Sequence, residues 1–277
     1  MPFSGSGWTP QSVTRFIQSY GTATGTARVD TDLGEGFIKA LGNPEGPHVL
    51  ACELVGSMLA DWLGLSTLDF SVIEVVEDDE IPLLKGGRAT PGPAFISRAE
   101  ATGFPWGGSV DELKTVHNSS DISGLVVLDT WILNCDRYAP QGRRMNRDNV
   151  FFVQYPGGRK DVLLKAIDFT HAFTCGREIN RRLGFIDNVQ DDNIYGLFPE
   201  FESFVDRDQV RRFSTRLGQF SRETADEFIA RVPQAWEVND EARGAWASML
   251  SGRARFVSET IEARLWTQLE FNQGGTA

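Results

Sequence analysis

The hydrophobic periodicity of the sequence changes along the chain, and this change limits the fold more than any other feature. Alternating apolar residues predict strands at 13–20, 26–32, 37–41, 70–76 and 94–97. Apolar residues at helical spacing predict helices at 48–63, 121–135, 207–217, 222–231 and 240–269. Two more short strands are expected at 149–154 and 162–167. A strand-rich beginning and a helical remainder predict an α+β fold with two lobes, residues 1–98 and residues 99–277.

The charge of the chain limits its partners. The sequence has a net charge of −11, from 27 Lys and Arg against 38 Asp and Glu. A protein that binds a nucleic-acid duplex normally presents a basic face, whereas basic residues cluster here only within 143–147 and 207–216. General nucleic-acid binding is therefore disfavoured. An acidic chain can still bind a polyphosphate, because a few donors and a divalent cation decide that contact locally.

The apolar runs and the cysteines bear on where the protein works. The sequence has no stretch of about 18 to 20 uninterrupted apolar residues, the length that a membrane-spanning helix requires. Its three cysteines, Cys52, Cys135 and Cys175, are an odd number at distant spacings, which indicates neither a disulfide framework nor a zinc site. Reduced cysteines are typical of the cytosol. We therefore expect a cytoplasmic protein that does not bind a membrane.

Five residues that can carry phosphate chemistry follow one another in a fixed order. Lys39 lies in a predicted strand, and Glu53 lies in the first predicted helix. Asp136 ends the second predicted helix, while Asn149 opens one of the last two short strands and Asp168 closes the other. Phosphoryl transfer needs a carboxylate beside the acceptor hydroxyl and oxygen ligands for a magnesium ion. Each residue alone is weak evidence, and only the ordered set favours a phosphotransferase.

Four motifs extend this pattern through residues 15–175. They are Phe37-Ile-Lys-Ala40, Ala51-Cys-Glu-Leu-Val-Gly-Ser-Met-Leu-Ala-Asp-Trp-Leu-Gly-Leu65, Asn134-Cys-Asp-Arg137 with Arg147-Asp-Asn-Val150, and Ile167-Asp-Phe-Thr-His171. Together they resemble the HipA-like kinases, a family of the protein-kinase-like superfamily related to type II phosphatidylinositol 4-kinases. The resemblance implies a bilobal protein-kinase-like fold, with a small strand-rich N-terminal lobe that binds ATP and a larger helical C-terminal lobe.

The resemblance gives each of the five residues a role. Lys39 would hold the α and β phosphates of ATP, and Glu53 would orient this lysine. Asp136 resembles the catalytic carboxylate that positions the acceptor hydroxyl or accepts its proton, and Asn149 and Asp168 resemble the ligands of Mg²⁺. An ordinary alternative stays open for each residue. Lys39 could be a solvent-facing strand lysine and Glu53 an exposed helix glutamate. Asp136 could cap a helix or pair with Arg137, and Asn149 and Asp168 could be turn residues.

The turn between the first two predicted strands resembles a phosphate-binding loop. Gly21 and Gly25 would let backbone N–H groups approach the phosphates, although the turn lacks the full G-x-G-x-x-G spacing. HipA-like enzymes can phosphorylate a hydroxyl of their own in this loop. The candidates by position are Thr22, Thr24 and Thr26.

The strand at 94–97 resembles the last strand of the small lobe at its exit to the hinge. Backbone groups of Ser97, Arg98 and Ala99 would then bind the adenine edge. The ordinary alternative is a common apolar strand followed by a turn. The next predicted element in the chain is the helix at 121–135, whose start Asp121 is expected to cap.

The catalytic segment departs from the kinase pattern in two places. Asp136 and Asn149 are 13 residues apart, whereas a typical kinase catalytic loop separates the two residues by about five. Residues 138–147 must therefore loop out, and we expect the arginines of this insertion to touch an acidic substrate or a phosphate, the alternative being a solvated loop. These arginines are Arg143, Arg144 and Arg147. Thr170 stands where protein kinases usually have Gly, which weakens a conventional protein-kinase identity more than it weakens phosphotransfer.

The sequence thus predicts an ATP- and Mg²⁺-dependent kinase of HipA-like type that phosphorylates Ser or Thr hydroxyls of a protein. Its expected partners are ATP and a protein substrate, with a regulatory protein partner left open. One rival is a catalytically silent nucleotide-binding pseudokinase or scaffold, which the incomplete glycine turn and the long insertion favour. Another is a lipid or small-molecule kinase, because the fold does not choose the acceptor.

Overall fold

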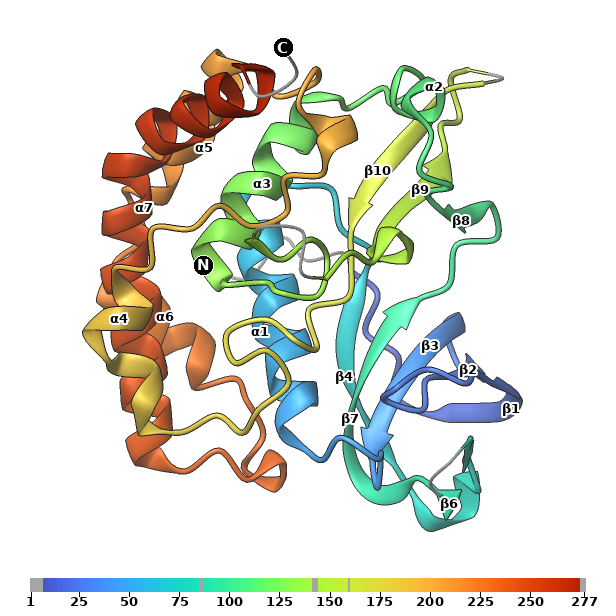
Figure 1. The fold of residues 1–277 in the computed structure, drawn as a ribbon. Helices are drawn as coiled ribbons and strands as arrows, with labels where there is room; N and C mark the ends of the chain where they lie inside the picture. Colours follow the sequence, from blue (N-terminus) through green and yellow to red (C-terminus); the bar gives the residue numbers. More distant parts are fainter. Residues whose placement is uncertain (1–6, 85–86, 141–143, 159, 275–277) are drawn as a thin grey trace.

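The N-terminal part of the protein is a five-stranded antiparallel sheet (Figure 1). The computed structural model describes residues 7–84, 87–140, 144–158 and 160–274. The strands of the sheet, in spatial order, are β1 (Val13–Ser19), β2 (Ala27–Thr31), β3 (Gly34–Leu41), β7 (Thr90–Arg98) and β4 (Phe70–Val75). Val29, Ile38 and Ile96 form a small apolar core on one face of this sheet. Because side chains alternate along a strand, Lys39 faces the opposite side.

Helix α1 (His48–Leu63) joins the sheet to the rest of the molecule. Figure 1 shows α1 between the strands on one side and the C-terminal helices on the other. Its side chains are buried almost all round, and they belong to the main apolar core together with those of α3 and α7. A helix that is apolar on every face fits a position between two layers. The carboxylate of Glu53 is therefore carried into the interior of the protein.

A second sheet of three strands lies in the C-terminal part. Its spatial order is β10 (Val162–Ala166), β9 (Val150–Gln154) and β8 (Gly103–Pro105). β9 and β10 occupy the two short strands that the sequence predicts, whereas β8 falls in a connection that contains glycines and a proline and shows no strand pattern. A two-stranded hairpin, β5 (Pro82–Leu83) with β6 (Gly87–Arg88), lies between β4 and β7 in the sequence.

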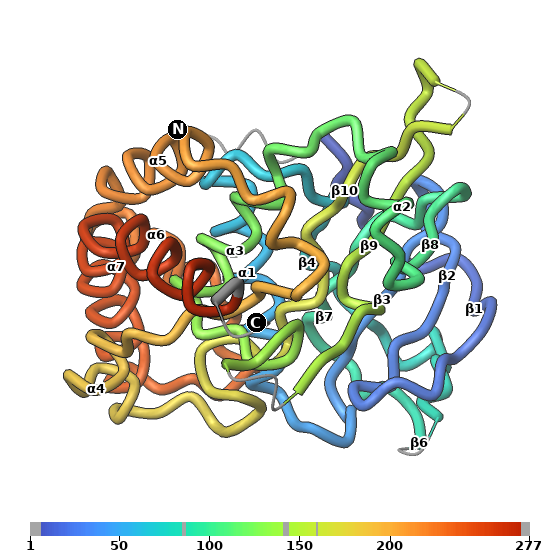
Figure 2. Tube along the Cα trace, turned by 45° about the horizontal axis from the view of Figure 1, so that its top comes forward, coloured from blue at the N-terminus to red at the C-terminus, as the bar shows by residue number. Residues whose placement is uncertain are grey.

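The α-helices of the C-terminal part are α2 (Val110–Leu113), α3 (Ser120–Ile132), α4 (Ile186–Val189), α5 (Arg207–Leu217), α6 (Arg222–Ile229) and α7 (Asp240–Gly274). Helices α4, α5, α6 and α7 form a layer on the side of α1 away from the first sheet, whereas α2 lies near β8, β9 and β10 (Figures 1 and 2). Short 3₁₀ helices are η1 (Glu77–Asp79), η3 (Arg147–Asn149), η4 (Arg181–Gly184), η5 (Pro199–Phe201) and η6 (Gln234–Trp236). α7 packs against α5 and α6. Trp236 of η6 donates a 2.9 Å hydrogen bond to the Pro93 carbonyl of β7, which ties this layer to the first sheet.

The predicted α+β architecture is confirmed, with α1 and α5 at the predicted bounds. The expectation that Asp121 caps α3 is wrong, because the N-cap is Ser119. Asp121 Oδ2 instead accepts hydrogen bonds from the Ser66 backbone N–H and from Asn118 Nδ2, so this carboxylate fixes the chain that follows α1. Within the described residues, no helix combines the length and the apolar character that crossing a bilayer requires.

Candidate active site

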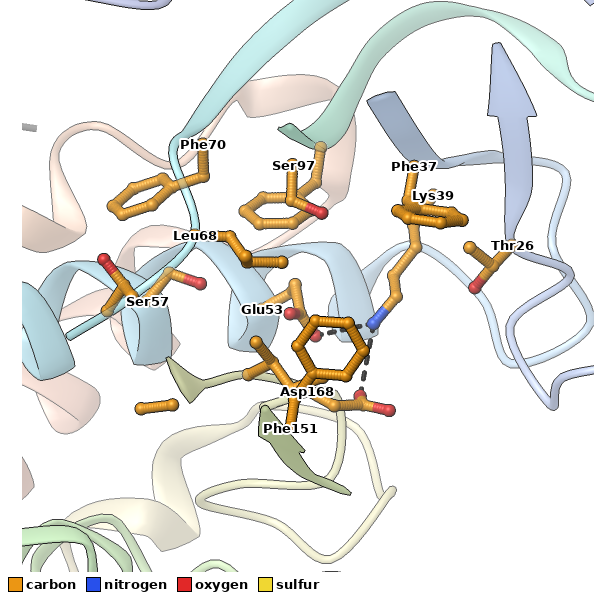
Figure 3. A pocket seen from close by; sticks show the side chains of 14 residues that line it. Thr26, Phe37, Lys39, Glu53, Ser57, Leu68, Phe70, Ser97, Phe151 and Asp168 are labelled. Carbon is orange, nitrogen blue, oxygen red and sulfur yellow. Dashed lines mark hydrogen bonds and ion pairs between the residues drawn. The ribbon is translucent and has the colours of Figure 1, made fainter. Parts of the chain in front are cut away.

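Lys39 lies between two carboxylates, those of Glu53 and Asp168 (Figure 3). Its Nζ is 2.9 Å from Glu53 Oε2 and 3.2 Å from Asp168 Oδ1. Burial opposes the charge of Lys39, but Asp168 and Glu53 outweigh this effect and raise its pKa above the usual value. The lysine therefore stays protonated, and β3, α1 and the segment after β10 meet at its ammonium group.

Glu53 also contacts the chain beyond Asp168. Its Oε2 accepts a 3.0 Å hydrogen bond from the Phe169 backbone N–H, in addition to the ion pair with Lys39. Burial raises the pKa of Glu53, and Lys39 limits this rise. One carboxylate thus holds both the lysine and the residue that follows Asp168.

Asp168 has a left-handed backbone conformation, with φ of 58°. Aspartate adopts this conformation more readily than most residues. Thr170 donates a 2.8 Å hydrogen bond from its hydroxyl to Asp168 Oδ1, so the residue that replaces the usual glycine helps to fix this carboxylate. Burial opposes ionisation, but Lys39 outweighs it and lowers the pKa of Asp168 to about 2. Asp168 is therefore ionised at any physiological pH.

Asp136 follows the end of α3 and is held on both carboxylate oxygens. Its Oδ2 accepts a 2.9 Å hydrogen bond from Asn149 Nδ2 and lies 3.4 Å from His171 Nδ1. Its Oδ1 lies 2.6 Å from the guanidinium of Arg144. Burial alone would raise the pKa of Asp136, but His171 and Arg144 bring it below the usual value. Asp136 and Asn149 are therefore neighbours, although they are 13 positions apart in the sequence.

A fully buried ion pair supports the segment that carries Asp136. Arg137 Nε donates to Asp129 Oδ2 at 2.8 Å, and Asn134 Nδ2 donates to Asp129 Oδ1 at 2.9 Å. Arg137 also donates a 2.9 Å hydrogen bond to the carbonyl of Ile167, the residue before Asp168. Arg137, held by Asp129, thus links the Asp136 segment to the Asp168 segment. No sequence motif singles out Asp129, although an acid in the middle of the apolar helix α3 is a recognisable signal.

The insertion between Asp136 and Asn149 closes on itself. The Ala139 N–H donates to the Arg144 carbonyl at 2.9 Å, and the Asn146 N–H donates to the Arg137 carbonyl at 2.9 Å. These bonds bring Asn149 back beside Asp136. The prediction for the insertion arginines has three outcomes: Arg144 pairs with Asp136, Arg147 pairs with Glu200 and lies over the Trp106 ring, and Arg143 falls outside the described residues.

A cavity of about 710 Å³, including its open mouth, adjoins Lys39 (Figure 3). Among the predicted site residues, Lys39, Glu53, Ser97 and Asp168 line it. The rest of the wall is mainly apolar and aromatic: Thr26, Phe37, Ser57, Thr67, Leu68, Phe70, Phe95, Phe151, Ala166 and Ile167. An apolar cleft with charged groups at one end is typical of a site for a ligand with a flat apolar part and an anionic part.

The other predicted nucleotide contacts lie near this cavity but are not among its lining residues. In the glycine turn, Gly21 and Gly25 do not line the cavity, whereas the neighbouring Thr26 does. The Arg98 N–H donates to the Asp69 carbonyl and the Ala99 N–H donates to the Glu35 carbonyl, so both groups are used within the protein. Of the three threonines in the turn, Thr22 is exposed and Thr24 is buried.

The oxygen donors of Asp168, beside Lys39, and of Asn149, beside Asp136, fit a hard divalent cation that is bound together with phosphate. In the described part of the chain, no cluster of three or more His, Cys, Asp and Glu side chains could bind a metal by itself. Asp168 lines the cavity with its side chain 34% exposed, and the Asn149 amide lies beside Asp136. Mg²⁺ is commonly held by one or two protein oxygens together with substrate phosphates. Asp168 and Asn149 are the residues that would hold it.

A disulfide lies next to Asp136. Cys135 and Cys175 are joined, with their Cα atoms 5.7 Å apart, and Cys52 is free and buried. The expectation of reduced cysteines is wrong for this pair, because the fold brings together two segments whose spacing in the sequence gives no indication of the bond. The disulfide connects the Asp136 segment to the chain beyond Asp168.

Comparisons with known proteins identify the family. The sequence matches the HipA-like kinases over residues 34–269. The chain belongs to the HipA-like kinase family. No curated protein sequence matches this HipA-like kinase. Among solved structures, the crystal structure of a Helicobacter pylori proinflammatory kinase, CtkA, is similar, with a TM-score of 0.59.

The structural match to CtkA covers 94% of this chain and 98% of the H. pylori chain, at 12% sequence identity. At this identity the likeness shows the fold alone. The predicted family and the kinase-like α+β fold are therefore confirmed. The roles of the individual site residues and the lobe boundary between residues 98 and 99 stay predictions.

Proposed function

We propose that this HipA-like kinase transfers the γ-phosphoryl group of ATP, with Mg²⁺, to a Ser or Thr hydroxyl of a protein. The observation that carries the proposal is the position of Lys39 Nζ, 2.9 Å from Glu53 and 3.2 Å from Asp168, at the charged end of an apolar cavity. ATP has a flat apolar base and a polyanionic tail, and this cavity matches both. Asp136 and Asn149 supply a second pair of polar groups that a phosphotransferase needs.

The proposed division of labour follows from charge and position. Lys39 would neutralise phosphate oxygens, and Glu53 would keep its ammonium group aimed into the cavity. Asp168 and Asn149 would hold Mg²⁺, which supplies charge neutralisation between the phosphates when bound. Asp136 would position the acceptor hydroxyl and accept its proton as the new P–O bond forms and the bond to the ADP oxygen breaks.

The lobes would then divide as the sequence indicates, with the nucleotide between residues 1–98 and residues 99–277. The apolar walls contributed by Phe37 and Phe95 on one side and Phe151 on the other support this placement of the base. A protein acceptor is proposed rather than a lipid because the chain carries a net charge of −11, which disfavours an anionic membrane surface.

One observation favours a second candidate, a nucleotide-binding pseudokinase. Arg144 lies 2.6 Å from Asp136 Oδ1, the oxygen that an acceptor hydroxyl would approach. If this pair never opened, the protein would bind nucleotide without transferring phosphate. The side chain of Arg144 is 52% exposed, so an acceptor can draw it away at modest cost.

The test is phosphate transfer from γ-labelled ATP, offered with Mg²⁺ or with a chelator, to casein or to phosphatidylinositol vesicles. We expect magnesium-dependent label on the protein acceptor or on the kinase itself, and none in Asp168→Asn. Label on the lipid alone would replace the protein acceptor with a lipid. Tight ATP binding without label on any acceptor would favour the pseudokinase, and no ATP binding would refute the proposal.

A further inference from the structure

His171 bridges two acidic residues from distant parts of the chain. It lies three residues after Asp168 and is 8% exposed. Its Nδ1 is 3.4 Å from Asp136 Oδ2, and its Nε2 is 3.0 Å from Glu45 Oε2 and 3.1 Å from Glu45 Oε1. The longer contact is within ion-pair range, and the shorter two are within hydrogen-bond range. The imidazole therefore connects the loop before α1 to the residue proposed as the catalytic carboxylate.

The Glu45 side of the bridge is fixed by its own loop. Asn43 is buried and donates from Nδ2 to the carbonyls of Ala40 and Gly46, at 2.9 and 3.0 Å. Its Oδ1 accepts a 3.0 Å hydrogen bond from the Glu45 backbone N–H. An asparagine that bonds its own turn in this way holds the turn in one conformation. Glu45 is therefore a defined partner for His171 rather than a mobile surface acid.

The backbone of the segment beyond Asp168 encloses the other side of the ring. Gly176 has φ of 79°, and a Cβ at this position would lie 3.0 Å from His171 Cδ2 and 3.3 Å from Nε2. Only a glycine allows this approach without displacing the imidazole. The neighbouring residue, Cys175, is bonded to Cys135, the residue before Asp136. His171 is thus held between the two segments that the disulfide joins.

The charges around His171 favour its protonated form. The close contact with Asp136 raises the pKa of His171 most, burial opposes the rise, and Glu45 adds to it. The charged groups that face the ring are Glu45 from the loop before α1 and Asp136 from the segment after α3, with Arg144 on the far oxygen of Asp136. A cation between two carboxylates also relieves their mutual repulsion.

We propose that His171 is a positioning residue, whose imidazolium is oriented by Glu45 and holds Oδ2 of Asp136 so that Oδ1 faces the acceptor hydroxyl. The inference rests on the proposed function, because it assigns a purpose to the orientation of Asp136. His171 forms no bond to substrate in this role. Asn149 Nδ2 holds the same oxygen at 2.9 Å, so the two side chains together fix the plane of the carboxylate.

The bridge predicts a pH response that a purely structural histidine would not give. As the pH rises and His171 loses its proton, the hold on Asp136 weakens and the transfer rate falls. Glu45→Gln keeps the shape of the loop but removes a charge, so we expect the His171 pKa to drop. The alkaline limb of the rate profile should then move to lower pH by the same amount.

The protonation of His171 can be measured without any turnover. The sequence has three histidines, His48, His117 and His171, so NMR titration of the imidazole signals is readily assigned. In wild type we expect the His171 pKa to lie above the usual value for histidine. Glu45→Gln and Asp136→Asn should each lower it. An unchanged His171 pKa in both variants would overturn the bridge.

The kinetic test uses His171→Gln, with His117→Gln as the matched control. We expect kcat to fall about 10- to 100-fold in His171→Gln, with little change in the KM for ATP and with loss of the alkaline limb. The control should keep the wild-type rate and profile. Transfer by wild type with an unchanged kcat and pH profile in His171→Gln would overturn this inference alone. No transfer by wild type would overturn the proposed function and the positioning role together.

Discussion

Replacing Gly56 with alanine tests how closely α1 must approach the Asp168 segment. A Cβ at Gly56 would lie 2.3 Å from Cβ and 2.5 Å from Cγ of Phe169, whereas carbon atoms pack at about 3.5 to 4.0 Å. Phe169 is fully buried and its N–H donates to Glu53. The methyl group therefore has to displace either the helix or the residue beside Asp168.

Two opposing effects set the size of the change. Alanine inside a helix is normally more stable than glycine by about 1 kcal/mol, while overpacking a core costs about 1 to 3 kcal/mol. The clash here is with Cβ and Cγ of Phe169, which side-chain rotation cannot move away, so the overpacking cost lies at the upper end of that range. We expect a net loss of about 1 to 2 kcal/mol, which lowers Tm by about 2 to 8 °C.

The assay for Gly56→Ala is calorimetric melting, followed by phosphate transfer. Displacement by about 1 Å near a reacting centre can cost about 100-fold in rate, so transfer should fall to a similar extent. Gly244→Ala in α7 is the control, because nothing lies within 4 Å of the added Cβ, and we expect a gain of about 0.5 to 1 kcal/mol there. A higher Tm in both variants would refute the close approach of α1 to Phe169.

Three further predictions concern charge and cross-linking. Lys39→Met should weaken ATP binding at least about tenfold by calorimetry. Because Lys39 lowers the pKa of Asp168 to about 2, the ion pair stabilises the folded wild type, and this stabilisation should be lost as the pH falls from about 4 towards 2. Urea unfolding of Lys39→Met should not show this loss of stability. Arg144→Ala should raise the KM for an acidic acceptor and leave ATP affinity unchanged, because Arg144 touches Asp136 and does not line the cavity. Reduction of the disulfide, which closes 40 residues, should cost up to about 4 kcal/mol of unfolding free energy, and Cys175→Ser should melt identically with and without reductant.

Local sequence signals were enough for the elements that carry the site. The helical spacing of apolar residues located α1 from His48 to Leu63, and strand alternation located β3 around Lys39. The order of Lys39, Glu53, Asp136 and Asp168 then indicated one site, because the family resemblance fixed which segments meet. Periodicity alone carries no information on which distant segments meet.

Other features depend on contacts between distant segments, and no local pattern contains them. The sequence predicts Asp121 as a helix cap, but its carboxylate accepts a hydrogen bond from the Ser66 backbone N–H. The sequence leaves open an ion pair between Arg137 and its neighbour Asp136, but Arg137 forms its ion pair with Asp129 inside the core. Glu45 lies in an ordinary loop until the fold brings it to His171. Each of these partners is set by tertiary packing rather than by spacing.

Separating binding from transfer tests the central claim most directly. ATP binding by calorimetry and transfer of labelled γ-phosphate should be measured with Mg²⁺ on the same preparations of wild type and Asp136→Asn. The account predicts that both proteins bind ATP with affinities within a few-fold, because Asp136 does not line the cavity, and that transfer falls by about 100-fold or more in the variant. Equal transfer by the two proteins would contradict the assignment of Asp136 as the residue that receives the acceptor hydroxyl.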